Sequence, residues 1–135
     1  EEAASHFEQA APLQQDAEDQ ALAVFYMAYA HSQLDAWEKA LPLLDKAIAL
    51  APDVKEYHNL RGVAHFKAAA YDDAARDFEA ALALDSGSAM DLANLGLCHK
   101  RLGHADAARE FLGKALEMDP GLEFARRNLE ELSGS

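Results

Sequence analysis

The sequence predicts an all-α protein built as a solenoid of antiparallel helix pairs, and three observations support this fold class. Small residues recur every 34 residues, since Ala47, Ala81 and Ala115 occupy one position of the period. Within each period the apolar residues are spaced three and four apart, as on one face of a helix, without strand-like alternation. Each period also contains two such segments with turn-forming residues between them. A fixed period of this length is typical of units that stack on their neighbours.

Other positions of the period indicate how the helices pack. Three further sets keep the 34-residue step: Ala40, Ala74 and Ala108; Leu44, Phe78 and Leu112; His31, His65 and His99. Gly62 and Gly96 fall in the middle of predicted helices, where Gly costs about 1 kcal/mol relative to Ala. We therefore expect a neighbouring helix to cross closely at these two glycines.

The breaks in the pattern give the expected bounds of the helices. The helix pairs should span residues 21–34 and 37–51, 55–69 and 71–85, and 89–102 and 105–119. Turns between the units are expected at the short segments Pro52-Asp53, Ser86-Gly87-Ser88 and Pro120-Gly121. After the last of these, residues 123–132 form one amphipathic segment. A helix there would cover the end of the stack, and repeat arrays need such caps.

The beginning of the chain departs from the period. Ala3, Phe7 and Ala10 repeat the spacing of the second helix of a unit, but Ala10 and Ala47 are 37 residues apart rather than 34. We interpret residues 1–11 as the second helix of an earlier, truncated unit, followed by a longer loop around Pro12. An unrelated capping helix is the alternative.

The third copy, NLGLCHKRLGHADAAREFLGKALEMDP, resembles the tetratricopeptide repeat. That family has 34-residue helix–turn–helix units with a small eighth residue, an A-x3-F-x2-A segment and a closing Pro. This chain departs from it at position eleven, where His replaces the usual Tyr, and at Ser86, which replaces one Pro. The resemblance implies a right-handed superhelix. It divides the chain into a partial unit at 1–20, repeats at 21–54, 55–88 and 89–122, and a cap with tail at 123–135.

Composition excludes several classes of function. The net charge is −12, and residues 1–20 contain six acids but no Lys or Arg, so nucleic acid is not an expected partner. No apolar run approaches the ~18 residues of a transmembrane helix, so no direct membrane insertion is expected. Cys98 is the single cysteine and cannot form an internal disulfide. This agrees with a reducing, cytoplasmic compartment, while a removed signal or a larger parent chain stays open.

The sequence gives no indication of catalysis, of a cofactor or of a metal. His31, His65 and His99 belong to successive stacked units about 10 Å apart, whereas a metal ion needs its nitrogen ligands near 2 Å. Cys98 and His99 are adjacent and therefore point to different faces of a helix. Phosphate-binding loops, zinc motifs and nucleophile motifs are absent from the sequence.

The first helix of the first unit has two apolar stripes, although a surface helix needs only one. We expect the first stripe to form the core of the repeat: Val24, Met27, Ala28, His31 and Leu34. The second is rotated from it and comprises Leu22, Phe25, Tyr26 and Tyr29. Coverage of this second stripe by residues 12–20, or by a missing preceding repeat, is the alternative to coverage by a partner.

In the tetratricopeptide repeat family the first helices line a concave groove. The resemblance assigns to it Leu22, Phe25, Tyr26, Tyr29, Asn59, Leu60, Val63, Phe66, Lys67, Met90, Asn94, Leu97, Lys100 and Arg101, together with Ser32, Gln33, Glu56 and Ala93. Such a groove is aromatic at one end, aliphatic in the middle and basic at the other end. It suits an extended or helical peptide with apolar anchors and a few acidic residues.

The residues also argue against one known use of this groove. The carboxylate clamp of chaperone-binding members needs Lys and Asn at positions five and nine of its first repeat, where this chain has Phe25 and Tyr29. We therefore predict a non-catalytic protein-interaction module that binds a protein or peptide without this clamp. A chaperone-type adaptor for a secreted or assembly protein, similar in architecture to class II type III secretion chaperones, and a self-associating scaffold are the alternatives.

Overall fold

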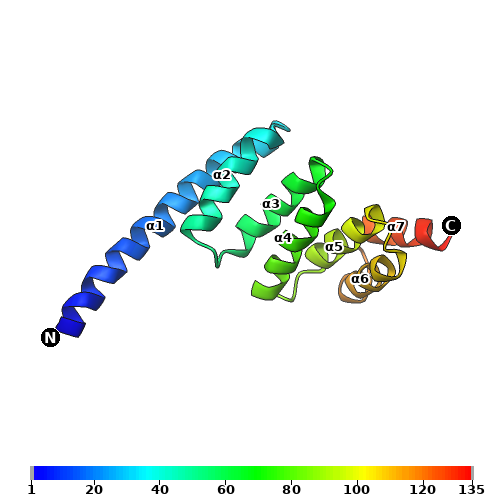
Figure 1. Cartoon of the computed structure of the whole chain (residues 1–135). Helices are drawn as coiled ribbons and strands as arrows, with labels where there is room; N and C mark the ends of the chain where they lie inside the picture. Colours follow the sequence, from blue (N-terminus) through cyan, green and yellow to red (C-terminus); the bar gives the residue numbers. More distant parts are fainter. Residues whose placement is uncertain (1, 135) are drawn as a thin grey trace.

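A computed structural model describes the backbone of residues 2–134 and the side chains of residues 13–134. This part of the chain forms helices and no strand: α1 (Glu2–Gln33), α2 (Trp37–Leu50), α3 (Lys55–Lys67), α4 (Tyr71–Leu84), α5 (Ala89–Arg101), α6 (Ala105–Met118) and α7 (Glu123–Ser133). Helices α1–α2, α3–α4 and α5–α6 form pairs that stack in chain order, so the termini lie at opposite ends (Figure 1). The predicted all-α solenoid is confirmed.

The turns inside the three helix pairs share one backbone conformation. Asp35, Ala69 and Gly103 occupy the same position of the period, and their φ angles are 57°, 61° and 82°. This left-handed region favours glycine, which only the third repeat has there. The repeat therefore fixes the shape of the turn even where the residue is not the one best suited to it.

The recurring small and apolar positions of the second helices form the core. Leu44, Phe78 and Leu112 are at most 1% exposed, and the alanines on either side of them are fully buried. A Cβ added at Gly62 would lie 2.9 Å from the Phe78 ring. At Gly96 it would lie 2.9 Å from Leu112 Cγ and 3.1 Å from the Leu112 backbone nitrogen. The two glycines therefore sit where helices cross closely, as predicted.

The loop expected around Pro12 is wrong. Helix α1 is continuous from Glu2 to Gln33, so residues 2–20 extend the first helix of the first repeat rather than form a separate one. Pro12 has no amide hydrogen to donate within the helix. The surrounding Ala, Gln, Glu and Leu residues are strong helix formers and favour continuation.

The predicted core stripe of α1 is also partly wrong. Met27 is 54% exposed, and Leu34, which lies beyond the end of the helix, is 79% exposed. Ala28 of the predicted stripe is fully buried, and Val24 and His31 are half-buried. The other buried residues of the helix are Ala21 and Ser32, with the half-buried Phe25 between them. The face toward α2 and α3 is thus rotated from the predicted one, because small residues allow the closest approach between helices.

The last helix covers the end of the stack. Ala125 is fully buried, and Phe124 and Leu129 pack beside it against Leu112 and Ala115 of α6. Within the described residues, no helix has the combined length and apolar character that crossing a bilayer requires.

Candidate peptide-binding groove

Helices α3, α4, α5 and α7 enclose an apolar pocket of about 400 Å³, which we call the groove pocket. It is lined by Val63, Phe66, Lys67, Phe78, Met90, Asn94, Leu97 and Phe124. All of these except Phe78 and Phe124 are among the groove residues predicted from the sequence. Phe78 was predicted as core, and Phe124 belongs to the cap. Six of the positions carried over from the family resemblance thus line one pocket, and two of the lining residues were not among them.

The basic residues at this end of the groove have different surroundings. Lys67 is exposed and has no ion-pair partner among the described side chains. The Arg101 guanidinium lies 5.8 Å from the centroid of the Phe66 ring, which is a cation–π distance. Lys100 turns away and donates hydrogen bonds to Asn128 Oδ1 at 2.8 Å and Glu131 Oε1 at 2.7 Å in α7. Its bond to Glu131 lowers the pKa of that carboxyl. Lys100 therefore holds the cap.

The opposite end of the groove carries an aromatic patch on α1, formed by Leu22, Tyr26 and Tyr29. Their side chains are 44%, 61% and 47% exposed. Phe25 is half-buried beneath them, with ring-centroid distances of 6.0 Å to Tyr26 and 6.4 Å to Tyr29. Leu22, Tyr26 and Tyr29 of the second apolar stripe thus form an open surface among the described residues, whereas Phe25 does not.

Several predicted groove residues lie between the repeats rather than on an open surface. Phe25 packs on Tyr57 of the next repeat at a ring-centroid distance of 4.8 Å. Asn59 donates a hydrogen bond to Asp91 Oδ1 of the following repeat. Ala93 is fully buried in one cluster with Ala125 of α7. Phe25, Asn59 and Ala93 share position five of the repeat, and each contacts position three of the next unit. The assignment of Ala93 to an open groove is therefore wrong.

One other assignment is corrected in the same way. Ser32 is only 6% exposed and donates to the Tyr29 carbonyl at 2.6 Å, so it does not line an open groove. Leu60 is half-buried and packs on the cluster of Ala28, Ala40 and Leu44, so it contributes to the core as well as to the surface.

Asp91 is a buried carboxylate at the junction of α3 and α5. It is fully buried, and its Oδ2 has no hydrogen-bond partner among the described residues. Burial raises the pKa of Asp91, while the hydrogen bonds from Ser88 and Asn59 oppose that rise. No sequence feature distinguished this residue from the acids on exposed helix faces.

The single cysteine is buried, and two of the three recurring histidines make local contacts. Cys98 is fully buried, and burial raises the pKa of its thiol to about 12, so a thiolate is not available at neutral pH. His65 lies 3.6 Å from Asp77, and His99 contacts His104, so these two histidines interact locally. No group of three or more His, Cys, Asp or Glu side chains placed to hold a metal ion occurs among the described residues.

Comparison with known proteins gives a consistent result. Two family models, each described as a tetratricopeptide repeat, match residues 27–89 and 89–122. Among solved structures, the first TPR of Spaghetti (RPAP3) bound to the HSP90 peptide SRMEEVD superimposes with a TM-score of 0.82 at 19% identity, covering 87% of this chain and 93% of that one.

Two further structures extend the comparison. The second TPR domain of human RPAP3, in complex with the HSP70 peptide SGPTIEEVD, has a TM-score of 0.81 and 21% identity, with coverages of 87% and 98%. MamA has a TM-score of 0.81 and 20% identity over 95% of this chain and 71% of its own. At these identities the likeness concerns the fold.

Proposed function

Because this chain belongs to the tetratricopeptide repeat family, we propose that it is a non-catalytic interaction module that binds a segment of a partner protein in the groove of α1, α3 and α5. The observation that carries the proposal is the groove pocket, an apolar cavity of about 400 Å³ between successive repeats. Its size and lining suit one or two apolar side chains of a peptide. Each buried anchor would contribute about 1.5–3 kcal/mol.

The charges around the groove pocket favour acidic residues beside the anchor. Lys67 lines the pocket, and Arg101 lies over the Phe66 ring at its edge. Exposed charges of this kind guide and orient a partner more than they hold it. The aromatic patch on α1 offers a second contact for a peptide that continues along the groove.

We expect the peptide to be held by apolar anchors and not by its C-terminal carboxylate. The similar RPAP3 domains bind HSP90 and HSP70 peptides that end in Glu-Glu-Val-Asp. The clamp residues implied by the family resemblance are Lys and Asn, whereas this chain has Phe25 and Tyr29 at those positions. Phe25 is moreover committed to its contact with Tyr57.

The test uses two methionines with the same exposure. Met90 lines the groove pocket and Met118 lies on α6, and both are 48% exposed. Photocrosslinking from position 90 in cells identifies the bound segment, which is then titrated against variants of the purified protein. We expect Met90→Glu to weaken binding about 10-fold or more, equivalent to about 1.4 kcal/mol, and Met118→Glu to change it less than 2-fold. Equal affinities for the two variants would contradict the proposal.

Self-association is a second candidate, favoured by the exposed aromatic patch. Leu22, Tyr26 and Tyr29 are all more than 40% exposed, and such a patch is a common interface between copies. Sedimentation over a wide concentration range tests this candidate. A dimer that dissociates in Tyr26→Ala would support it, and a monomer at the highest concentration would exclude it.

A further inference from the structure

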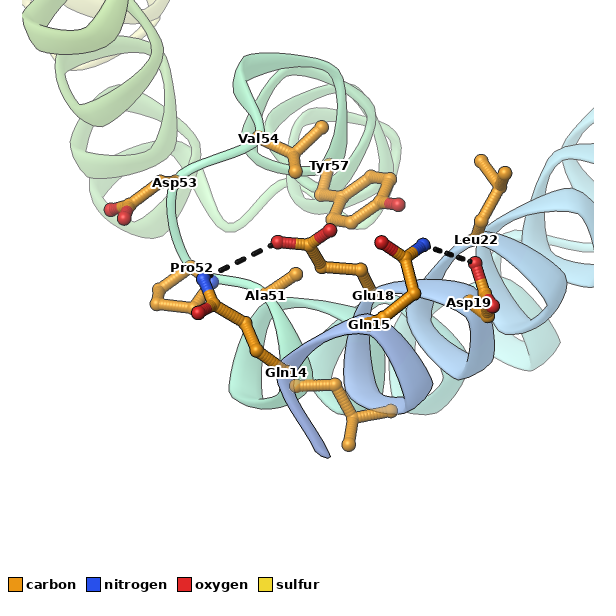
Figure 2. A pocket seen from close by; sticks show the side chains of 11 residues that line it. Gln14, Gln15, Glu18, Asp19, Leu22, Ala51, Pro52, Asp53, Val54 and Tyr57 are labelled. Atoms are coloured by element: carbon orange, nitrogen blue, oxygen red, sulfur yellow. Dashed lines mark hydrogen bonds between the residues drawn. The ribbon is translucent and has the colours of Figure 1, made fainter. Parts of the chain in front are cut away.

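A second pocket lies at the other end of the molecule, between α1 and the turn that joins α2 to α3. We call it the terminal pocket, and its volume is about 450 Å³. Its lining residues come from about two and a half turns of α1 and from the segment around the α2–α3 turn: Gln14, Gln15, Glu18, Asp19, Leu22, Leu50, Ala51, Pro52, Asp53, Val54 and Tyr57. Figure 2 shows the side chains of α1 facing Pro52 and Val54 across the pocket, with the Tyr57 ring beside them.

The floor of the terminal pocket is apolar. Tyr57 is 4% exposed and Val54 is half-buried, and both belong to the core cluster around Ala21 and Ala47. Leu22 is 44% exposed and is shared with the aromatic patch, so the two surfaces are continuous. An occupant of this pocket would therefore meet both aliphatic and aromatic surface.

The rim of the terminal pocket is acidic and is not neutralised within the described structure. Glu18, Asp19 and Asp53 line it, and no Lys or Arg does. The amides of Gln14 and Gln15 donate to Glu18 at 3.4 Å and to Asp19 at 3.0 Å, which leaves the negative charge in place (Figure 2).

The basic residue nearest in sequence is directed elsewhere. Lys55 follows Val54 directly, but its ammonium group donates to Asp85 Oδ2 at 2.9 Å. Burial raises the pKa of the Tyr57 hydroxyl, and the nearby charges of Glu56 and Glu18 raise it further. Glu18 on the rim thus acts electrostatically on the Tyr57 hydroxyl in the floor.

The end of α2 adds a second source of negative potential. Leu50 and Ala51 line the terminal pocket, and the last turn of α2 contains no basic residue. The carbonyls of residues 48–50 accept no hydrogen bond from any described residue. The C-terminal end of a helix carries a partial negative charge that cations stabilise.

We propose that the terminal pocket binds a cationic segment of a partner protein, in which an Arg or Lys side chain is flanked by an apolar residue. The charged head would lie beside Glu18, with Asp53 adding negative charge at the rim, and its methylene stem and the apolar neighbour would cover Leu22 and Val54. Arg suits the site better than Lys, because its planar guanidinium can serve several oxygens at once. The groove pocket carries Lys67 and Arg101 instead, so the two sites would select segments of opposite charge.

The test measures binding of a fluorescein-labelled peptide, Gly-Leu-Arg-Leu-Arg-Gly, against a twin in which citrulline replaces each Arg. We expect the citrulline twin to bind about 5-fold more weakly at low salt, as two partly exposed ion pairs would give, and the difference to shrink at high salt. Equal affinities for the two peptides, or no binding of the Arg peptide at millimolar protein, would overturn the proposal.

Matched variants separate the pocket from the general negative charge of the protein. Glu18→Gln combined with Asp53→Asn should weaken the Arg peptide about 5-fold, whereas Glu79→Gln combined with Glu117→Gln, on exposed faces of α4 and α6, should change it less than 2-fold. A similar loss in both double variants would show unspecific attraction and overturn the proposal.

Two single variants test the apolar floor and the independence of the site. Leu22→Ser should weaken the Arg peptide, whereas Leu84→Ser, at 43% exposure beside 44% for Leu22, should not. Met90→Glu should leave this peptide unaffected. If Met90→Glu weakens binding of the Arg peptide and Leu22→Ser does not, the peptide binds in the groove pocket. This result would overturn the terminal-pocket proposal and leave the proposed groove function intact.

Discussion

The two junctions between successive repeats use the same positions with opposite chemistry. At the first junction the Phe25 ring packs on Tyr57 at 4.8 Å. At the second junction Asn59 donates a hydrogen bond to the buried Asp91 carboxylate. The partners are 32 residues apart in both cases. The period thus fixes which positions meet, but the residues at those positions decide what holds the junction and how it responds to pH.

The two contacts also differ in energy. An aromatic pair removes a large apolar area from water and contributes further through its ring geometry. A buried carboxylate loses hydration, and Asp91 recovers only part of it, since Oδ2 has no partner among the described residues. We therefore expect the first junction to be the stronger one, and the second to be the one that conditions can change.

The largest expected effect is the loss of the aromatic contact. Tyr57 is 4% exposed, so Tyr57→Ala should leave a cavity and lower the free energy of unfolding by about 3–5 kcal/mol, as for other buried aromatic residues. Urea denaturation measures this change. Tyr26→Ala, at 61% exposure, is the control and should cost no more than about 0.5 kcal/mol. Similar costs for the two variants would show that the first junction does not depend on the ring.

The second expected effect is smaller and depends on the partner. Asn59→Ala removes the hydrogen bond to Asp91 and leaves the buried carboxylate with less support, at a cost of about 1–3 kcal/mol at neutral pH. Adding Asp91→Ala removes the buried carboxylate that has lost its hydrogen bond from Asn59. The double variant should therefore be more stable than Asn59→Ala alone. Strictly additive losses in this double-mutant cycle would contradict coupling between the two residues.

The sequence predicted the fold well wherever the period applies. The expected bounds of the helices from residue 37 onward differ from those of α2 to α6 by at most two residues. The period fails before the first repeat, because no copy there constrains the pattern, and the loop expected at Pro12 is part of one helix. The core stripe of α1 was wrong at two residues: Met27 and Leu34 are apolar but exposed, whereas the small residues Ala21, Ala28 and Ser32 are buried.

The candidate site was predictable only in part. The groove positions carried over from the family resemblance include Val63, Phe66 and Leu97, and all three line the groove pocket. They did not identify Phe124, which lies in the cap outside the repeats. Nor did they show that Lys100 is held by Glu131, because that contact joins a repeat to a segment with another pattern. The burial of Asp91 likewise depends on its neighbours in space.

The smallest expected effect tests how the second junction responds to pH. Burial raises the pKa of Asp91 in the folded protein, so between the unfolded and folded pKa values the native state binds more protons than the unfolded state. The contribution of Asp91 to the free energy of unfolding is therefore fully present below the unfolded pKa, and it is lost as the pH rises through the raised folded pKa.

Asp91→Asn keeps an oxygen to accept from Asn59 but cannot ionise, so its stability should lack this dependence. At neutral pH the variant should lie within about 1 kcal/mol of the original protein, because the lost charge also removes a favourable interaction with the α5 amino terminus. Urea denaturation from pH 4 to pH 7 measures the difference in free energy of unfolding between the two proteins. The contributions of the other titrating groups are the same in both proteins and cancel in this difference. The stability of Asp91→Asn relative to the original protein should increase as the pH rises. A difference that does not change with pH would mean that burial does not raise the pKa of Asp91.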